Sequence, residues 1–384
     1  MNKLYNTQNE IASNLRTFLE NCVNNIRKTQ LNIIPHIMFG MIQAESCSAP
    51  DIAKVLKEEF SQVQYNSIVK RINRFWKNDL FNPHDFYNDI IIHVLETYKK
   101  KHADKRVHIT FDHMFSHDNY TVFMITMKIG TQGIPLWFKC FKDSTNKEAF
   151  KFETLKEGIQ EVSNLFKNTD FELIFLADRW FCSNDLLDFI DKLGHTYCVR
   201  IKGNISVYKD GIKTKAKKLK HRKHRTIVHE NVLITDKRFK TNIVYSNSIN
   251  TNTPWIIVTN KNSSKAIKDY GYRFGSIECL FKNQKSNGFN IEKISNATID
   301  SFTTIYTLVC TCVLFLTIIG ADYSKNSNCY KKNKIEAHKV YNICGTKTKK
   351  RIMSLFNTGL TLFKRAINSI IYIRIPFSFI LYDI

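Results

Sequence analysis

The sequence predicts an α/β protein in which helices flank a mixed β-sheet, with a helical region before the sheet and a β-rich insertion within it. Residues 1–104 carry apolar side chains mostly at helical spacing. After residue 105, three β-prone runs follow one another, and then helical and β-prone segments alternate, which is typical of a sheet covered by helices. Residues 204–252 interrupt this alternation with further β-prone runs around a basic segment. We therefore divide the chain into the parts 1–104, 105–203, 204–252, 253–325 and 326–384.

The composition indicates a globular protein with a polyanionic partner. The chain has 384 residues and 43% hydrophobic side chains, which excludes global disorder and predicts more than one packed unit. Its 57 Lys and Arg residues outnumber its 34 Asp and Glu residues, giving a net charge of +23. An excess of this size favours nucleic acid as the partner, although a membrane surface would also attract it.

The cysteines and the N-terminus favour a reduced, cytoplasmic compartment. The ten cysteines include no C-x-x-C pair, so the sequence does not indicate a zinc site. The first residues, MNKLYNTQNEIASNLRTFLEN, lack the apolar segment of a secretory signal peptide. We expect a cytoplasmic protein.

Two short helices in the N-terminal region form a candidate DNA-binding unit. The first begins at Ser48, a suitable N-cap residue, and the second covers QYNSIVKRINRFWKN. The basic residues of the second helix lie off its apolar face; the candidates for DNA contact are Lys70, Arg71 and Arg74. The pair resembles a helix-turn-helix, but two solvated amphipathic helices explain the pattern as well.

The elements of the first core part follow in order. RVHITFDHM, NYTVFMITMKIG and IPLWFKCF read as strands, with the turn TQG between the last two. A helix is predicted over residues 146–168, and then a strand that ends in Asp178. The next helix is capped by Ser183 and stopped by Gly194, and TYCVRIKG forms the following strand.

The insertion and the second core part complete the predicted sheet. The basic run Lys213–Arg225 precedes two strands and suits the DNA backbone, with Lys218 and Arg222 as candidate contacts, although such runs are often only solvated. PWIIVTN is a further strand, and two helices meet near Phe274–Ser276. Residues 302–321 carry no charge but several threonines, which favours a buried core helix over a membrane span. Residues 326–384 are basic and then apolar, and they indicate no particular role.

Two aspartates follow apolar β-prone runs in matching contexts. Asp112 follows VHITF and Asp178 follows LIFLA, so each is expected at the end of its strand. Neighbouring strands would bring the two carboxylates together, because strand ends are where sites form in open α/β sheets. Like charges that close repel unless a cation lies between them, and oxygen-only ligands favour Mg²⁺ or Mn²⁺. Taken singly, an ion pair with Arg179 also explains Asp178, and a turn beside His113 also explains Asp112.

Glu278 is a third acid, within the basic stretch YRFGSIECLFKNQKSNGF. A helix is predicted to start at Ser276, as N-cap, and to run toward Lys285. Glu278, Lys282 and Lys285 then share one helix face. The spacing alone is explained by a Glu–Lys pair on that face, which contributes only a few tenths of a kcal/mol.

From about residue 105 to about residue 290, the sequence resembles the DDE transposases of bacterial insertion sequences. The resemblance rests on the order Asp112, Asp178, Glu278 and on the stretches GIPLWFKCFKDST, LADRWF and YGYRFGSIECLFKNQK. It is greatest with the branch whose third acid lies in the signature Y-x-x-R-x-x-x-E-x-x-x-x-x-x-K.

The signature residues match with one departure. Tyr270 and Arg273 keep the Y-x-x-R spacing, and Glu278 and Lys285 keep six residues between them. Four residues separate Arg273 from Glu278, where the signature has three. Either Tyr270 or Tyr272 can therefore occupy the tyrosine position.

The resemblance implies a fold and a reaction. It implies an RNase H-like core whose three acids bind two Mg²⁺ ions, or Mn²⁺ in their place. The implied reaction is strand cleavage by water at the ends of the insertion sequence, followed by strand transfer, in which the freed 3′-OH attacks a phosphodiester. The alternative is a transposase-derived DNA-binding protein that is catalytically inactive.

The resemblance also implies DNA contacts and partners. Arg273, Lys285 and Tyr270 would hold phosphates beside the reacting bond, and Trp255 would stack on a flipped base, although a core tryptophan also fits that position. The expected partners are double-stranded DNA, as terminal inverted repeats and as target, and a second copy of the chain in a homodimer on paired ends. No membrane partner is expected, and the protein would act at the nucleoid of a bacterial cytoplasm.

Overall fold

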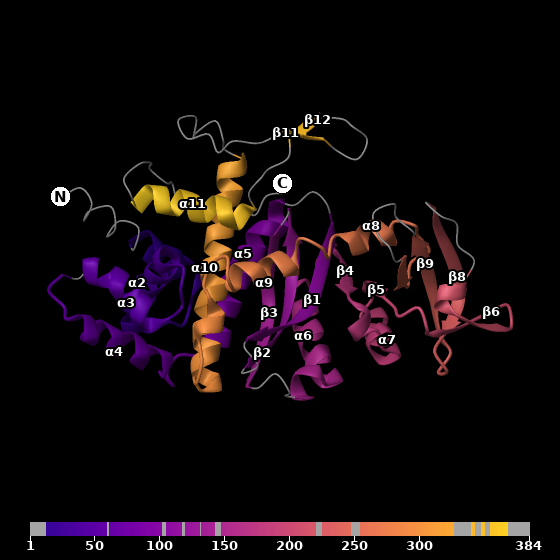
Figure 1. The fold of residues 1–384 in the computed structure, drawn as a ribbon, viewed down its shortest axis with the longest axis horizontal. Helices are drawn as coiled ribbons and strands as arrows, with labels where there is room; N and C mark the ends of the chain where they lie inside the picture. Colours follow the sequence, from indigo (N-terminus) through magenta and orange to yellow (C-terminus); the bar gives the residue numbers. More distant parts are fainter. Residues whose placement is uncertain are drawn as a thin grey trace.

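A computed structural model describes residues 13–59, 61–101, 105–116, 120–130, 132–142, 147–219, 225–246, 254–325, 339–341, 347–349 and 354–367. Its N-terminal part is helical, as predicted: residues 13–22 form a helix, followed by α2 (Lys28–Ala44), α3 (Ala49–Glu59), α4 (Tyr65–Trp76) and α5 (Pro83–Lys101). Helices α2, α3 and α4 lie at the left of Figure 1, to one side of the sheet, and α5 lies beside the sheet near the centre of the view.

Helix α4 has the amphipathic character that its sequence predicts. Ile68, Ile72 and Phe75 are buried in the core. Its basic residues face solvent on the other side: Lys70, Arg71, Arg74 and Lys77 are exposed. A continuous basic strip along one helix is therefore available to an anionic partner.

Within the described residues, one sheet holds ten strands in the order β3-β2-β1-β4-β5-β10-β9-β8-β6-β7 (Figure 1). The strands are β1 (Arg106–Ser116), β2 (Tyr120–Ile129), β3 (Gln132–Lys142), β4 (Glu172–Ala177), β5 (Thr196–Arg200), β6 (Ser206–Lys209), β7 (Ile212–Lys215), β8 (Thr226–Ile234), β9 (Phe239–Ser246) and β10 (Trp255–Thr259). The short strands β11 (Lys339–Tyr341) and β12 (Lys347–Lys349) pair with each other.

The first five strands form an RNase H-like core. β1, β2 and β3 pair antiparallel in sequence order, and β4 and β5 then add in parallel on the other side of β1. The central strands are apolar on both faces because helices cover both: on β4, Leu173 and Phe175 on one face and Ile174 and Leu176 on the other are fully buried. The predicted mixed sheet with flanking helices is confirmed.

The β-rich insertion continues this sheet. β10 pairs antiparallel with β5 and with β9, and β8, β6 and β7 extend the sheet beyond β9. Because β10 follows the insertion in sequence but pairs directly with β5, the inserted strands are built onto the edge of the core.

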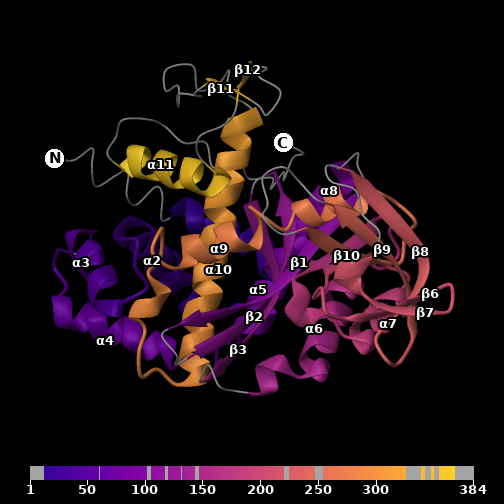
Figure 2. The ribbon, with the colours of Figure 1, turned by 45° about the vertical axis from the view of Figure 1, so that its right-hand side comes forward.

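Helices cover the two faces of the sheet. α6 (Phe152–Leu165) and α7 (Asn184–Lys192) lie on one side, and α8 (Ala266–Gly271) and α9 (Ile277–Gln284) lie on the other (Figures 1 and 2). Ser183 caps α7 by accepting a hydrogen bond from the backbone N–H of Leu186, as predicted. The single helix predicted over 146–168 was wrong, because an extended Lys151 separates a short 3₁₀ turn, η1 (Lys147–Phe150), from α6.

Helix α10 (Ile299–Lys325) stands between the N-terminal helices and the sheet (Figure 2). Within the described residues it is the one helix long and apolar enough to cross a membrane, and its most apolar window is entirely buried within the protein. Three of its hydroxyl groups are satisfied locally, since Thr303, Thr311 and Thr317 each donate a hydrogen bond to a carbonyl one turn back. The predicted core helix is therefore confirmed.

Helix α11 (Leu355–Ile367) crosses α10 at very close range. A Cβ atom added at Gly359 would lie 1.9 Å from the carbonyl oxygen of Leu316, and one added at Gly320 would lie 1.9 Å from that of Leu355. Two backbones that approach this closely leave no room for a side chain. The crossing thus requires glycine on both helices.

We expect Gly359→Ala to lower the free energy of unfolding by about 2 kcal/mol or more, because the added methyl group must push α11 away from α10. Urea denaturation followed by circular dichroism measures the change. Thr361→Ala, at a partly exposed position of the same helix, serves as the control and should change stability by less than about 0.5 kcal/mol. Equal stability of Gly359→Ala and wild type would contradict the close crossing.

Candidate active site

Strand register brings Asp112 and Asp178 to the same edge of the sheet. The last parallel pair between β1 and β4 joins Thr110 to Leu176, and each aspartate lies two residues beyond its member of that pair. The carboxylates therefore leave the ladder side by side. Asp178 also caps η2 (Arg179–Phe181), where its Oδ1 accepts a hydrogen bond from the backbone N–H of Arg179 at 2.7 Å.

The prediction that the first strand ends at Asp112 was wrong in one respect. β1 continues to Ser116, because its antiparallel pairing with β2 extends to the pair Ser116–Tyr120. Only the parallel ladder with β4 ends before Asp112. Beyond this point β4 no longer pairs with β1, so the edge of β1 that faces β4 is open at Asp112.

Glu278 reaches the same edge from α9. The backbone turns at Gly275, which has a left-handed φ of 78°, and α9 begins at Ile277. The extra residue between Arg273 and Glu278 is thus accommodated in this turn. Ser276 occupies the N-cap position, but the prediction that its side chain caps the helix was wrong, since its buried hydroxyl makes no capping hydrogen bond and has no partner within the described part of the chain.

The α9 turn is held tightly against the sheet. A Cβ atom added at Gly133 on β3 would lie 2.9 Å from the carbonyl oxygen of Ser276, so glycine permits the contact. On the neighbouring helix α8, Asp269 accepts hydrogen bonds from Arg106 at 2.9 Å and makes one with His108 at 3.0 Å. Burial alone would raise the pKa of Asp269, but these hydrogen bonds hold its pKa below the usual value. The segment between α8 and α9 is consequently anchored at both ends.

The three acids share one electrostatic environment. The pKa of Asp112 is raised, first by burial and then by the negative charges of Asp178 and Glu278, against the opposing effect of Arg273 and a backbone hydrogen bond. The geometry agrees: Arg273 contacts both Asp112 and Glu278, and strand register places Asp178 beside Asp112. Sequence-distant acids from β1, η2 and α9 therefore form one cluster.

Arg273 bridges two of these acids. Its guanidinium donates to Asp112 Oδ2 at 2.6 Å and to Glu278 Oε1 at 3.2 Å. The Arg273 side chain is only 7% exposed, whereas Glu278 is 48% exposed, so the arginine is the buried member of the group. Among the residues that the structure describes, its Nε has no hydrogen-bond partner. A fixed cation thus occupies the space between the first and third acids.

The donor set suits a hard divalent cation. All three acids offer carboxylate oxygens, and their mutual repulsion favours a bound positive charge. Among the residues that the structure describes, no three His, Cys, Asp or Glu side chains gather closely enough to enclose a metal ion. The guanidinium of Arg273 accounts for this spacing, since it separates the carboxylates of Asp112 and Glu278.

Comparison with known families matches this region directly. Residues 96–315 match the family model described as the transposase DDE domain, which is more than half of the chain and includes all three acids. The chain belongs to the DDE transposase family. No curated protein matches the transposase.

Among solved structures, the transposase is similar to the Argonaute of Marinitoga piezophila in complex with guide RNA and target DNA. The two share 15% identity at a TM-score of 0.21, over 48% of the transposase and 28% of the Argonaute chain. The chain thus spans less than a third of that protein, and the fold assignment rests on the strand order described above.

Lys285 of the transposase is engaged with protein groups. Its ammonium donates to the backbone carbonyl of Phe115 at 2.6 Å and forms an ion pair with Glu292 at 2.8 Å. Lys282 is exposed, and within the described residues no ion pair joins it to Glu278. The bond to Phe115 places Lys285 at the end of β1, near the acids.

Tyr270 and Trp255 of the transposase lie together. The Tyr270 ring is fully buried and packs edge-on against Trp255, with 5.3 Å between ring centroids. Burial raises the pKa of Tyr270 to about 12, against the smaller opposing effects of the nearby Arg273 and Arg200. One face of the half-buried Trp255 is stacked on Phe274 at 5.3 Å. Tyr272, the other tyrosine candidate, packs against His108 at 4.5 Å.

The remaining residues predicted to contact DNA belong to helix α4 and to the insertion, far in sequence from the three acids. Lys70, Arg71 and Arg74 form the exposed strip on α4. Lys218 is exposed at the end of the 3₁₀ turn η3 (Ala216–Lys218) in the insertion. Arg222 lies outside the described residues.

The structure adds a feature that the sequence reasoning missed. A cavity of about 580 Å³ lies beside the acids and is lined by Asp112, His113, Phe115, Phe150, Leu155, Asp178, Trp180 and Phe181. Its aromatic residues come from β1, η1 and η2, so no single stretch of sequence displays them together. The only available signal was the stretch DRWF, in which two aromatic residues follow Asp178 closely.

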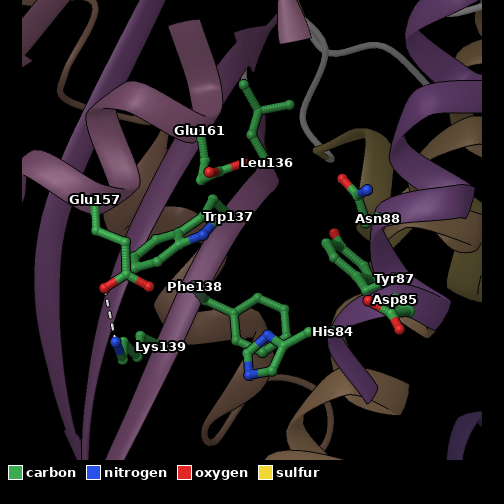
Figure 3. A pocket seen from close by; sticks show the side chains of 10 residues that line it. All are labelled: His84, Asp85, Tyr87, Asn88, Leu136, Trp137, Phe138, Lys139, Glu157 and Glu161. Carbon is green, nitrogen blue, oxygen red and sulfur yellow. Dashed lines mark hydrogen bonds and ion pairs between the residues drawn. The ribbon is translucent and has the colours of Figure 1, made fainter. Parts of the chain in front are cut away.

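Another cavity, of about 290 Å³, has a different character (Figure 3). It lies between α5, β3 and α6 and is lined by three carboxylates, Asp85, Glu157 and Glu161. Its lysine, Lys139, forms an ion pair with Glu157 at 2.7 Å. Excess negative charge makes this cavity a poor site for DNA.

Proposed function

We propose that the transposase binds the terminal inverted repeats of its insertion sequence and catalyses strand cleavage followed by strand transfer. The observation that carries the proposal is the placement of the acids: strand register puts Asp112 beside Asp178, and Arg273 bonds both Asp112 and Glu278, within the region that matches the family. Of the two possibilities raised by the sequence, an intact set of three acids supports the active enzyme over an inactive DNA-binding derivative.

The three acids would hold two Mg²⁺ ions, or Mn²⁺. When bound, these ions activate the attacking oxygen and stabilise the leaving 3′ oxygen. Asp112 and Asp178 present their carboxylates from the rigid ladder, and Glu278 does so from α9. A water is the first nucleophile, and the 3′-OH that it frees is the second, so one site serves both steps.

The basic residues near the acids would position the phosphates. Tyr270, Arg273 and Lys285 match the tyrosine, arginine and lysine of the Y-x-x-R…E-x(6)-K signature, which supports a role for them in binding phosphate. For Lys285 to bind a phosphate, it must exchange its ion pair with Glu292 for the DNA. Likewise, Arg273 must exchange its ion pairs with Asp112 and Glu278 for a contact with a phosphate. Trp255 is half-buried, and the exposed part of its ring would stack on a base.

Long-range attraction would bring the DNA to these groups. The exposed basic strip of α4 and Lys218 of the insertion are proposed backbone contacts, together with Arg222. We further propose that two copies act on paired ends as a homodimer in the bacterial cytoplasm.

The direct test uses DNA that carries the two terminal inverted repeats of the element flanked by unrelated sequence. We expect nicks at the ends in the presence of Mg²⁺ and none in EDTA, followed by joining of the freed 3′ ends to a target plasmid. Binding of the ends without any strand cleavage in Mg²⁺ or Mn²⁺ would instead establish the inactive DNA-binding protein.

The α4 strip gives a quantitative prediction. Replacing Lys70, Arg71 and Arg74 together by glutamine should weaken DNA binding and reduce the slope of log K against log salt by up to about 3, because each lost phosphate contact removes about 0.9 from the slope. Fluorescence anisotropy at several salt concentrations measures this.

The matched control removes three exposed lysines from the face covered by α6 and α7: Lys156, Lys167 and Lys192. This variant loses the same net charge and should keep the wild-type slope. Equal slopes for the α4 variant and wild type would show that α4 does not touch DNA.

A further inference from the structure

Helix α9 carries the third acid near an end that has little support of its own. The helix has only eight residues, Ile277–Gln284, and Ser276 makes no capping hydrogen bond. Glu278 is half-exposed and forms its ion pair with Arg273. Since an isolated helix of this length is unstable in water, contacts elsewhere on α9 must hold Glu278 in place.

Two buried amides at the other end of α9 bond it to β3 and to α10, the elements on which it lies (Figure 1). Asn283 donates a hydrogen bond to Oε1 of Gln132 on β3 at 3.2 Å. Gln284 accepts one from the hydroxyl of Tyr306 on α10 at 2.8 Å and donates one to Sγ of Cys310 at 3.4 Å. Asn283 is 4% exposed, and the other side chains of this set are fully buried.

The two amides leave α9 on opposite sides of its inner face. Successive residues of an α-helix are about 100° apart, so Asn283 lies about 140° from Glu278 in one direction and Gln284 about 120° in the other. Rotation of α9 moves both amides, and their hydrogen bonds weaken steeply once distance and angle leave a narrow range. The buried apolar side chains Ile277 and Leu280 make contacts without a preferred direction, which tolerate a small rotation.

Stability alone does not explain polar side chains at these positions. Replacing both partners of a buried hydrogen bond by apolar groups of the same shape is nearly neutral or even stabilising. A fully bonded polar network instead selects one arrangement of the core. A functional group must be held within about 0.5 Å and about 10–20° of its productive position, so a metal ligand on a short helix needs directional contacts of this kind.

We infer that these buried polar side chains fix the rotation of α9 and thereby position Glu278 beside Asp112. The α9 clamp, as we call the set, consists of Gln132, Asn283, Gln284 and Tyr306. Its members are positioning residues, because they act on the reaction only through the place of Glu278. The inference rests on the proposed function, since it assumes that Glu278 is placed to hold a cation.

Mn²⁺ binding to the protein without DNA, followed by electron paramagnetic resonance, tests the clamp. Gln284→Met keeps a side chain of similar length but removes both hydrogen bonds, and Tyr306→Phe removes only the hydroxyl. Partners that orient metal ligands typically contribute about 10–100-fold to metal affinity. We therefore expect the Mn²⁺ concentration at half-saturation to rise about tenfold or more in Gln284→Met, and in the same direction in Tyr306→Phe.

Tyr87→Phe is the matched control. The Tyr87 hydroxyl is also buried and donates a 2.8 Å hydrogen bond to β3, at the carbonyl of Pro135, but it lies outside the clamp. Both Tyr→Phe variants should lower the melting temperature by similar amounts. Only Tyr306→Phe should weaken Mn²⁺ binding.

A second measurement reports on α9 without metal or catalysis. Cys279 follows Glu278 in α9 and is a half-buried free thiol. Its alkylation by iodoacetamide in EDTA, located by peptide mass spectrometry, should be several-fold faster in Gln284→Met than in wild type or Tyr87→Phe, because a loosened helix exposes the thiol.

Unchanged Mn²⁺ affinity in both clamp variants overturns the inference, whatever the reactivity of Cys279. Equal weakening by Tyr87→Phe also overturns it, since lost stability would then explain the effect. If Gln284→Met does not fold, Tyr306→Phe decides by the same criteria. Failure of the proposed function appears separately, as wild-type protein that neither binds Mn²⁺ nor nicks DNA; equal Cys279 alkylation in all variants would then overturn the clamp as well.

Discussion

Asp178→Ala is expected to abolish strand cleavage, with a rate at least about 10³-fold below wild type. Asp178 is one of three acids proposed to hold the cations that stabilise charge at the reacting phosphate, and loss of one such electrostatic contribution typically costs a factor of about 10²–10³ or more. Nicking of end-containing DNA in Mg²⁺, measured as single-turnover kinetics, gives the ratio directly.

The variant should still bind the ends, because Asp178 is an acid and contributes no attraction to phosphates. Asp185→Ala is the control: this aspartate is exposed in the first turn of α7, pairs with Lys237 at 3.5 Å and lies outside the acid cluster. It should cleave at the wild-type rate. Wild-type cleavage by Asp178→Ala would remove Asp178 from the active site.

Arg273→Gln is expected to make the stability of the protein depend on metal. In the wild-type structure the guanidinium neutralises Asp112 and Glu278. Glutamine leaves two neighbouring carboxylates without a counter-ion, and breaking a buried pair costs about 3–5 kcal/mol. We expect about 2–3 kcal/mol, because Glu278 is half-exposed and solvent screens part of the repulsion.

Addition of Mn²⁺ should therefore raise the melting temperature of Arg273→Gln more than that of wild type, since in the variant the cation meets no competing charge. Differential scanning fluorimetry with and without Mn²⁺ measures the difference, independently of catalysis. Lys282→Gln removes an exposed cation from the same face of α9 as Glu278 and should behave as wild type. Equal Mn²⁺ shifts in Arg273→Gln and wild type would show that Arg273 and the metal do not compete.

The sequence predicts the placement of the two aspartates at one edge of the sheet because their positions follow from local rules. An apolar run marks each strand, and parallel pairing fixes the register, so acids two residues past Thr110 and Leu176 must meet. The third acid required the spacing signature, since nothing local distinguishes Glu278 from a helix surface residue.

The partners of Arg273 were not predictable in the same way. The sequence shows one extra residue before Glu278. It does not show that this residue is accommodated by a left-handed turn at Gly275, or that the guanidinium of Arg273 then contacts Asp112 and Glu278. The aromatic cavity escaped prediction because Phe115, Phe150 and Trp180 come from separate elements. Likewise, the glycines that allow α11 to cross α10 are meaningful only once both helices are placed.

The direct pairing of β10 with β5 has a mechanical consequence. Trp255–Thr259 form hydrogen-bonded ladders with the core on one side and with β9 of the insertion on the other. An insertion joined to a core through a continuous hydrogen-bonded sheet moves with the core, whereas one joined through a flexible linker can rotate relative to it. DNA bound to the insertion would therefore keep a fixed orientation relative to the acids, because the insertion and the core would move as one rigid body.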